Sequence, residues 1–348
     1  MLNKTNIYIY APDIHEGDAV GNHCIGLSQL CEQLGYCTFL FAQRYSTQCA
    51  GVHISDATEI FDLIKADDYL FVSYSIFDSF LDEVTSLECK KICYYHDVTP
   101  HELLNDFEPI TAELCRKALL QLPKMEIFNR VIASSNFSRN RLQKYISNCC
   151  ISVIPPVFRG FGLLKYDSHH NKRSDFFDLL YVGRVVPHKR IEDVIETFSL
   201  LCKYSGCRNR LFIVGSMPNY AYSKMLYNLA RKLGVAERIT FTGTLSDADL
   251  AERFNSADAY LSMSEHEGFC IPVLEAMYFS LPCIIRSGTA ADDLLGAHRY
   301  QVSSANDAAK AIVNLMDKPQ SCTLYKQRVE EIVAQTNEEV WDAIFSEL

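Results

Sequence analysis

Residues 179–198, LLYVGRVVPHKRIEDVIETF, contain the pattern that decides the fold of this protein. An apolar run ends at Gly183, a short basic loop follows, and a helical periodicity begins near Arg190. A continuous apolar strand is typical of a parallel sheet covered on both faces, and the helix that follows it would supply one cover. This stretch therefore predicts one strand–loop–helix unit of an α/β sheet.

The same succession recurs along the whole chain. In the first half we expect strands at 6–11, 37–42, 69–75, 91–96 and 130–134, and helices at 22–34, 76–86, 109–122 and 137–146. In the second half we expect strands at 178–184, 210–216, 238–244, 258–264 and 281–287, and helices at 190–204, 220–233, 247–256, 271–280 and 305–317. Two such sets predict an α/β protein of two Rossmann-like domains. Residues 154–177, rich in Pro, Gly and polar residues, predict the linker.

Composition narrows the class of protein. The chain has 348 residues, long enough for two domains, and it is 48% hydrophobic and 22% charged, as expected of a soluble globular protein. Its net charge of −10 argues against nucleic acid as a partner. We expect no membrane span and no signal peptide, because the apolar runs are short and the N-terminus lacks the pattern. The 14 cysteines include no Cys-x-x-Cys pair, which favours reduced, buried thiols in a cytoplasmic protein.

The loop after Gly183 carries the first candidate site. Gly183 permits a tight turn, Arg184 comes next, and Lys189 follows after four more residues. A guanidinium and an ammonium group at a strand end suit a diphosphate. The alternative is a solvent-facing loop, but cations at a helix N-terminus oppose its dipole, so we favour the phosphate interpretation.

The stretch SEHEGFCIPVLEAM, residues 264–277, carries the second candidate site. Pro272 is suited to the first helical position, so Glu267 would lie in the loop and Glu275 in the first turn of the helix. The backbone N–H groups of three residues would face an anion at this helix start: Gly268, Phe269 and Cys270. Carboxylates beside an anion site could accept hydrogen bonds from sugar hydroxyls. Alternatively, Glu275 only complements the helix dipole.

Together these motifs resemble the signatures of family 4 retaining glycosyltransferases. That family has the GT-B fold, in which two Rossmann-like domains have the active site between them. The resemblance covers residues 178–296 and includes FIVGSMP at 212–218 and ITFTGT at 239–244. It implies domains at 1–158 and 175–334, with a C-terminal helix at 335–348 that packs back onto the first domain.

The resemblance also implies roles for single residues. Arg184 and Lys189 would neutralise the departing donor diphosphate, Glu267 would bind hydroxyls of the donor sugar, and Glu275 would bind the ribose. Further donor-binding positions are Gly183, Gly215, Thr244, Gly268, Phe269 and Cys270. Gly is commoner in the family where Cys270 stands, so we expect a narrower sugar pocket here.

The N-terminal half agrees with this resemblance. Gly17, Gly21 and Asn22 follow the first strand and resemble the family's glycine-containing loop, with Gly21 on the donor side and Asn22 on the acceptor side. This spacing is not the dinucleotide fingerprint, which disfavours a dehydrogenase. His96 and Asp97 directly follow a strand, and by resemblance His96 would contact the donor sugar and Asp97 the acceptor.

Two further features each allow two interpretations. Asp247 and Asp249 invite a metal-binding interpretation, but Ser246 with Asp249 before a helix is more simply a capping box, so we expect no metal. Residues 116–144 form a basic stretch that is either a solvated helix surface or a contact with anionic lipid or a lipid-diphosphate acceptor.

These expectations define a function. We expect a metal-independent, retaining hexosyltransferase that uses a GDP- or UDP-linked sugar and a glycan or lipid-linked acceptor, in bacterial surface polysaccharide synthesis. It would be cytoplasmic or peripheral at the inner face of the cell membrane. The alternatives are a nucleotide-sugar epimerase or phosphorylase of the same fold, and a non-catalytic protein that binds sugar nucleotides or glycans. Glu265 has no assigned role.

Overall fold

The computed structural model describes residues 5–15, 17–46, 52–158, 163–168, 175–206, 208–296, 300–318 and 322–347. The chain folds into two compact units. The first unit comprises Met1–His101, Ile110–Phe161 and Ile332–Leu348, and the second comprises Glu102–Pro109 and Gly162–Glu331. The segment Glu102–Pro109 is the main difference from the expected domain boundaries, because it leaves the first half of the chain to join the second unit. In the expected linker, residues 159–162 and 169–174 lie outside the described part.

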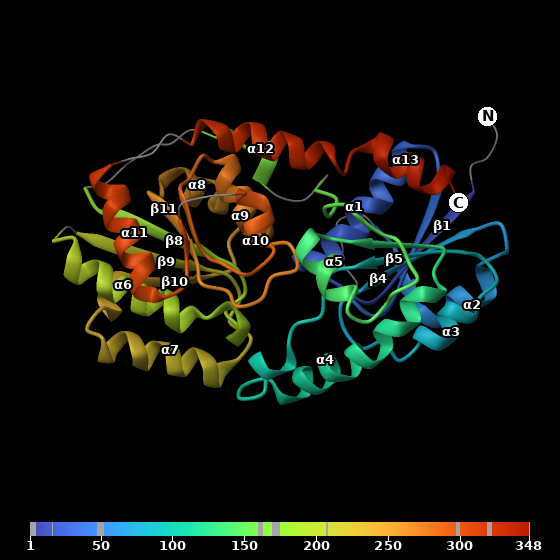
Figure 1. Ribbon diagram of the computed structural model, residues 1–348, viewed down its shortest axis with the longest axis horizontal. Coiled ribbons are helices and arrows are strands. Elements are labelled where there is room, and N and C mark those ends of the chain that lie inside the picture. Colours follow the sequence, from blue (N-terminus) through green and yellow to red (C-terminus); the bar gives the residue numbers. More distant parts are fainter. Residues whose placement is uncertain are drawn as a thin grey trace. The chain divides into compact units, whose positions relative to one another are not determined.

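The first unit is built on a seven-stranded sheet with the order β3-β2-β1-β4-β5-β6-β7. Figure 1 labels β1, β4 and β5 of this sheet. Its strands are β1 (Asn6–Ile14), β2 (Cys37–Tyr45), β3 (Ile54–Asp56), β4 (Tyr69–Tyr74), β5 (Lys90–Tyr95), β6 (Arg130–Ala133) and β7 (Ile151–Val153). All neighbouring strands pair in parallel, as continuous apolar strands predict.

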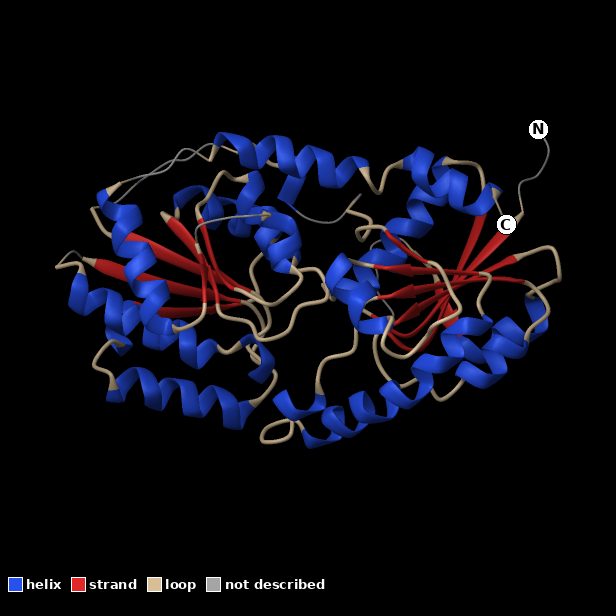
Figure 2. Cartoon of the chain, in the orientation of Figure 1, coloured by secondary structure: helices blue, strands red, loops and turns tan. Residues whose placement is uncertain are grey.

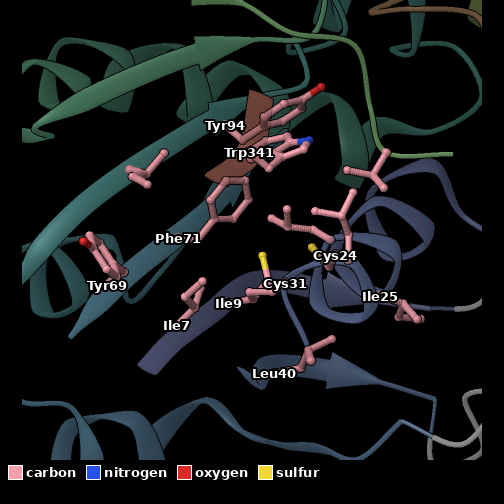
Figure 3. Packing of buried hydrophobic residues seen from close by; sticks show 14 of the residues in the cluster. Ile7, Ile9, Cys24, Ile25, Cys31, Leu40, Tyr69, Phe71, Tyr94 and Trp341 are labelled. Atoms are coloured by element: carbon pink, nitrogen blue, oxygen red, sulfur yellow. The ribbon is translucent and has the colours of Figure 1, made fainter. Parts of the chain in front are cut away.

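Helices cover both faces of this sheet (Figure 2). They are α1 (Ala19–Gln33), α2 (Ile60–Leu63), α3 (Leu81–Ser86), α4 (Pro109–Gln121), α5 (Asn136–Leu142) and α13 (Glu338–Ser346). Trp341 on α13 lies against the rings of Phe71 and Tyr94 in the buried core (Figure 3). Burial of this large aromatic side chain places the C-terminal helix in the first unit.

The second unit is built on a six-stranded parallel sheet with the order β10-β9-β8-β11-β12-β13. Its strands are β8 (Phe177–Val182), β9 (Asn209–Val214), β10 (Ile239–Gly243), β11 (Ala259–Ser262), β12 (Cys283–Arg286) and β13 (Gln301–Val302). Its helices are α6 (Ile191–Tyr204), α7 (Tyr220–Lys232), α8 (Asp247–Ser256), α9 (Ile271–Tyr278), α10 (Ala291–Leu295) and α11 (Ala305–Asp317), and α12 (Thr323–Ala334) leads back to the first unit.

Alternate residues of each central strand face opposite layers of helices. On β11, Leu261 joins the core formed with α6, α7 and α11, whereas Tyr260 stacks on Phe254 of α8. Both positions are buried, so side chains on both faces of the strand are apolar and its sequence is one apolar run.

The strand order sets the place where a ligand would bind. In each sheet the order reverses next to the first strand of the unit, between β1 and β4 in the first and between β8 and β11 in the second. Ligands of open parallel sheets bind at the carboxyl ends of the strands at such a switch point. The loops after β8 and β11 are the two stretches that the sequence singles out.

The described residues include no helix that is long and apolar enough to cross a membrane. Among the described cysteines none forms a disulfide, and six are buried thiols: Cys24, Cys31, Cys93, Cys115, Cys270 and Cys283. Burial as small apolar side chains agrees with the expected role of these thiols.

Candidate active site

Glycines allow the strand ends of the second unit to approach one another. Gly215, after β9, has φ +140°, and a Cβ atom built there would lie 2.1 Å from the carbonyl oxygen of Gly183. Gly183, after β8, has φ +150° and donates its N–H to the Val214 carbonyl at 2.9 Å. Both glycines are therefore required by backbone geometry at the edge where the candidate ligand site lies.

Lys189 and Glu267 form an ion pair at this edge. Lys189 ends the short 3₁₀ turn Pro187–Lys189 after β8, and Glu267 lies in the loop after β11. The Lys189 Nζ to Glu267 Oε2 distance is 2.5 Å, and the two side chains are only 18% and 9% exposed. The structure thus brings together two residues, 78 positions apart, that the sequence predicts to share one site.

Arg184 is the exposed cation of this group. Arg184 follows Gly183 in the sequence, and its side chain is accessible to solvent. Within the described ranges Arg184 forms no ion pair, whereas Lys189, Arg190 and Arg286 all pair with carboxylates. Arg184 is accordingly the cation best placed to receive an anion from solvent.

The loop that carries Glu267 leads into α9 through a left-handed residue. Cys270 has φ +77° at the N-cap position and its side chain does not cap the helix. Phe269 and Cys270 are buried, and Gly268 is partly exposed. Burial and the neighbouring Glu267 raise the pKa of the Cys270 thiol, so the thiol stays neutral. Thr244, predicted to bind the donor, is exposed just after β10.

Glu275 is buried on α9. It is the fifth residue of the helix, which corrects its expected place in the first turn, where no acidic residue lies. Burial raises the pKa of Glu275 to about 8, and the negative charge of Asp247 adds to the rise. Glu275 is thus largely protonated near neutral pH and can donate as well as accept a hydrogen bond. A neutral carboxyl group outside the first turn does not complement the helix dipole, so that interpretation of Glu275 is not supported.

The sequence gives no role to three charged residues that the structure joins to Arg190. Glu265, Asp193 and Arg286 form a network with Arg190 at the carboxyl ends of β8, β11 and β12. Arg286 ends a predicted strand next to β11, so the rule that sites lie at strand ends could have singled it out.

In the first unit, the loop after β1 is held by its own residues. The Gly17 N–H donates to Asn22 Oδ1 at 3.0 Å. A Cβ atom on Gly21 would lie 2.0 Å from the His15 carbonyl oxygen, so Gly21 permits the loop to pack on α1. Their predicted ligand contacts stay predictions.

His96 lies at the carboxyl end of β5 next to a second histidine. Its Nε2 is 2.7 Å from Ser73 Oγ, and its ring is edge-on to that of His23 at 5.2 Å. Burial lowers the pKa of His96 to about 3 and also lowers that of His23. His96 is therefore neutral at physiological pH and suited to hydrogen bonding rather than to acid catalysis.

Asp97, expected on the acceptor side, is held by contacts within the first unit. Its side chain is fully buried and pairs with Arg141 at 3.0 Å, and it also accepts from the Val98 N–H and the Tyr95 hydroxyl. Asp97 has φ +80°. These contacts hold the turn after β5, and the acceptor-side role of Asp97 stays a prediction.

The acidic pair Asp247 and Asp249 lies in the first turn of α8, where Ser246 is the N-cap. Ser246 Oγ accepts from the Asp249 N–H at 3.2 Å and donates to Asp249 Oδ2 at 2.6 Å. Asp247 pairs with Lys165 at 3.0 Å. The capping interpretation is confirmed, and within the described residues no group of three or more His, Cys, Asp or Glu side chains could hold a metal ion.

Much of the predicted basic stretch 116–144 is neutralised within the protein. Its paired cations are Arg116 and Lys117 with Glu113, Lys124 with Asp82, Arg130 with Glu347, and Arg141 with Asp97. This pairing favours the solvated-surface interpretation for those five cations. Exposed apolar side chains lie in the same region, namely Ile110, Leu120 and Ile127.

The segment Glu102–Pro109 brings a further carboxylate to the second unit. Asn219 Nδ2 donates to the Phe107 carbonyl at 2.6 Å, and the Phe107 ring is edge-on to that of Tyr222 at 5.1 Å. Burial raises the pKa of the neighbouring Glu108, and the positive charge of Arg184 counters the rise. No local pattern in the sequence indicates this association.

The arrangement in the second unit suits a ligand with phosphate and hydroxyl groups. A guanidinium and an ammonium group can bind phosphate oxygens, and Glu267 and Glu275 can bind hydroxyls. All four side chains belong to loops or helices that follow β8 and β11.

Comparison with known proteins agrees with this chemistry. Residues 164–331 match the family described as glycosyl transferases group 1. The serotype-specific mannosyltransferase WbdA of Escherichia coli is 25% identical over 250 residues, which are 66% of this chain and 30% of that protein. The D-inositol 3-phosphate glycosyltransferase of Actinosynnema mirum is 33% identical over 147 residues, 38% of this chain and 34% of that protein. The chain thus spans about a third or less of the length of these relatives.

Solved structures show the same fold. The lipopolysaccharide outer core galactosyltransferase WaaB aligns with a TM-score of 0.71 at 13% identity, over 99% of this chain and 100% of that one. HepE of Anabaena, solved with UDP and glucose, aligns with a TM-score of 0.70 at 14% identity, over 98% of each chain. The expected GT-B fold is confirmed. Residues 164–331, slightly less than half of this chain, match the family of glycosyl transferases group 1.

Proposed function

We propose that this protein is a retaining, metal-independent glycosyltransferase that moves a hexose from a nucleotide-diphosphate sugar to a hydroxyl of a glycan or lipid-linked acceptor. The observation that carries this proposal is the Lys189–Glu267 pair at the switch point, with the exposed Arg184 in the same loop as Lys189. A sugar nucleotide presents phosphates to the two cations and hydroxyls to the carboxylate. The name of the relative WbdA makes mannose the first hexose to test, linked to GDP or UDP.

The reaction requires neutralisation of charge on the leaving group. As the bond between the sugar and the diphosphate breaks, Arg184 and Lys189 would stabilise the departing negative charge. The acceptor hydroxyl would bond to the same face of the reacting carbon, and a donor phosphate oxygen would take its proton. No covalent nucleophile and no metal are needed for these steps, because the cations and the positioning of the substrates supply the catalysis.

His96 and Glu275 would act as neutral hydrogen-bonding groups. His96 would contact the donor sugar as an uncharged imidazole, since its pKa is about 3. Glu275 would meet the ribose hydroxyls as a carboxyl group that is partly protonated, since its pKa is about 8. The glycine and loop positions described above would line the remainder of the donor site.

The product would belong to bacterial surface polysaccharide synthesis, and the reaction would take place in the cytoplasm or at the inner face of the cell membrane. The exposed side chains of Ile110, Leu120 and Ile127 are suited to a peripheral contact with lipid. Sedimentation with vesicles that contain anionic lipid tests this contact, with the triple change of these residues to Ser as the matched variant.

The first experiment is calorimetry with UDP, GDP and ADP on the wild type and on Arg184→Ala. We expect one nucleotide to bind and the variant to bind it at least tenfold more weakly. Incubation with the cognate hexose nucleotide, a glycan acceptor and EDTA should then give a product whose anomeric configuration, read by NMR, matches that of the donor. Arg184→Ala should lower turnover by about 100-fold or more, because it removes charge stabilisation in the transition state.

Other outcomes identify the other candidates. Conversion of the nucleotide sugar with no acceptor and no net release of nucleotide would indicate an epimerase, and phosphate-dependent release of a sugar phosphate would indicate a phosphorylase. Tight binding without any turnover would indicate a binding protein. Loss of activity in EDTA would refute metal independence, and an absence of binding to all three nucleotides would refute the proposal as a whole.

A further inference from the structure

Four charged side chains form a closed ring beside the candidate site, here called the charge ring: Arg190, Asp193, Glu265 and Arg286. Glu265 Oε1 accepts from Arg286 Nη1 at 2.9 Å and lies 3.5 Å from Arg190 Nε. Asp193 closes the ring, because it accepts from Arg286 Nη2 and from Arg190 Nε, the latter at 3.2 Å. Each carboxylate of the ring therefore contacts both guanidinium groups.

The ring joins the two loops that carry the Lys189–Glu267 pair. Arg190 directly follows Lys189, and Glu265 stands two residues before Glu267. Arg286 at the end of β12 anchors the ring to the sheet. The loops are also joined by backbone, since the Glu265 N–H donates to the His188 carbonyl at 2.9 Å.

The charge ring is partly buried from solvent, which strengthens its ion pairs. The side chains of Asp193 and Arg286 are 12% and 16% exposed, and that of Glu265 is 32% exposed. Isolated surface ion pairs contribute little, but a partly buried network that joins three elements is screened less by water and salt. Arg190 has a left-handed backbone with φ +52°, so its contacts also hold a strained residue in place.

We propose that Glu265 is a positioning residue: through Arg190 and Arg286 it fixes the spacing of the two loops and so sets the Lys189–Glu267 pair. This inference rests on the proposed function for the part that concerns the donor. In this role Glu265 acts through the two guanidinium groups and not on the substrate. It is the ring member that comes from the loop after β11, so it provides the connection between that loop and the rest of the ring.

The test compares Glu265→Gln with a matched control in the same unit. The change keeps the size of the side chain and removes its charge, and Arg190 and Arg286 retain Asp193 as a partner. The control is Asp178→Asn, whose carboxylate accepts two bonds from Arg210, at 2.7 and 2.6 Å, at the amino end of β8. A second, milder control is Glu331→Gln, which breaks the exposed pair with Arg328.

We expect Glu265→Gln to raise the Kd for UDP or GDP, whichever the wild type binds, by about tenfold. The controls should change this Kd by less than twofold even where they lower the melting temperature as much. Glu265→Gln should have little further effect in an Arg286→Met background, because both changes open the same ring. Equal Kd values for Glu265→Gln and the wild type, or full additivity of the two changes, would refute the positioning role.

A second measurement needs no ligand. Hydrogen exchange in ligand-free protein should become faster in the peptides that cover 185–190 and 262–270 in Glu265→Gln, and stay unchanged there in both controls. If the wild type binds no nucleotide, the proposed function fails, and the exchange measurement alone decides whether the ring positions the loops. Unchanged exchange in Glu265→Gln would refute the inference whatever the nucleotide experiments show.

Discussion

The packing of Gly215 against Gly183 allows a prediction with a matched control. In Gly215→Ala, the new Cβ atom would lie 2.1 Å from the Gly183 carbonyl oxygen and 2.7 Å from its carbon, and the residue would keep φ near +140°. Gly243→Ala is the control, because Gly243 has φ +71° at the end of the next strand and no atom beyond its chain neighbours lies within 4 Å of the new Cβ. Both variants place Ala at positive φ, and only one also creates an overlap.

The two variants should lose measurably different amounts of unfolding free energy. Gly243→Ala should lower the free energy of unfolding by about 1 to 2 kcal/mol, the usual cost of a left-handed residue. Gly215→Ala should lower it by about 3 to 5 kcal/mol, because a backbone region reserved for glycine costs about 1 to 3 kcal/mol and overpacking about as much again. The Gly183 backbone must move to relieve the overlap, and Arg184 must move with it, so nucleotide binding should weaken in Gly215→Ala alone.

Urea denaturation with two probes measures this difference. The single tryptophan, Trp341, is buried in the first unit, so its fluorescence follows that unit. Circular dichroism follows the helices of both units, and a transition seen by dichroism alone belongs to the second unit. If Gly215→Ala and Gly243→Ala agree within about 1 kcal/mol, the close approach of the two strand ends does not limit stability and the reasoning fails.

Three further predictions follow from buried groups. Because the pKa of Glu275 is about 8 when folded and 4.5 is its ordinary value, the folded protein holds a proton between these pH values that the unfolded chain loses. The stabilisation from this proton is present at low pH and disappears as pH rises to 8, so Glu275→Gln should gain about 3 to 5 kcal/mol on the wild type between pH 5 and 9 in denaturation curves; a parallel pH profile would contradict this. Cys270→Gly should be about 1 kcal/mol more stable than Cys270→Ala, the reverse of their order in a helix, and equal melting temperatures would mean that the left-handed backbone is not strained. Asp97→Asn should cost about 3 kcal/mol because it leaves Arg141 without its carboxylate partner, with no change in nucleotide Kd; weaker nucleotide binding at unchanged stability would contradict this expectation.

The extent to which the sequence predicts the fold depends on the length of each element. The central strands are continuous apolar runs and were predictable, whereas α2, β7 and β13 have only two to four residues and cannot show a period. The predicted helix 76–86 begins only at Leu81. Asp78 explains the late start, because its carboxylate accepts from the Phe80 N–H and from the distant Tyr10 hydroxyl and so competes with the helix. A partner 68 positions away leaves no mark in the local pattern.

The candidate site likewise has features that the sequence predicts and features that it does not. Lys189 and Glu267 were predictable because each lies in the connection that follows a strand, and parallel strands bring such connections to one edge. The ion pair of Asp97 was not predictable, since its partner Arg141 lies 44 positions further along the chain. The raised pKa of Glu275 depends on burial, which the sequence of its own helix does not determine.

Backbone strain explains why part of the site could not be recognised from its residue types. A left-handed turn is normally marked by glycine, yet Asp97, Arg190 and Cys270 adopt positive φ as ordinary residues at the carboxyl ends of strands. The strain at Asp97 and Arg190 is offset by ion pairs, to Arg141 and to the charge ring, whereas Cys270 lies buried at the start of α9 beside Glu267. Glycine in these places would remove the strain and also the contacts. Asp97 and Arg190 therefore each fix the loop of their own unit through their side chains, and that arrangement is visible only once the distant partners are known.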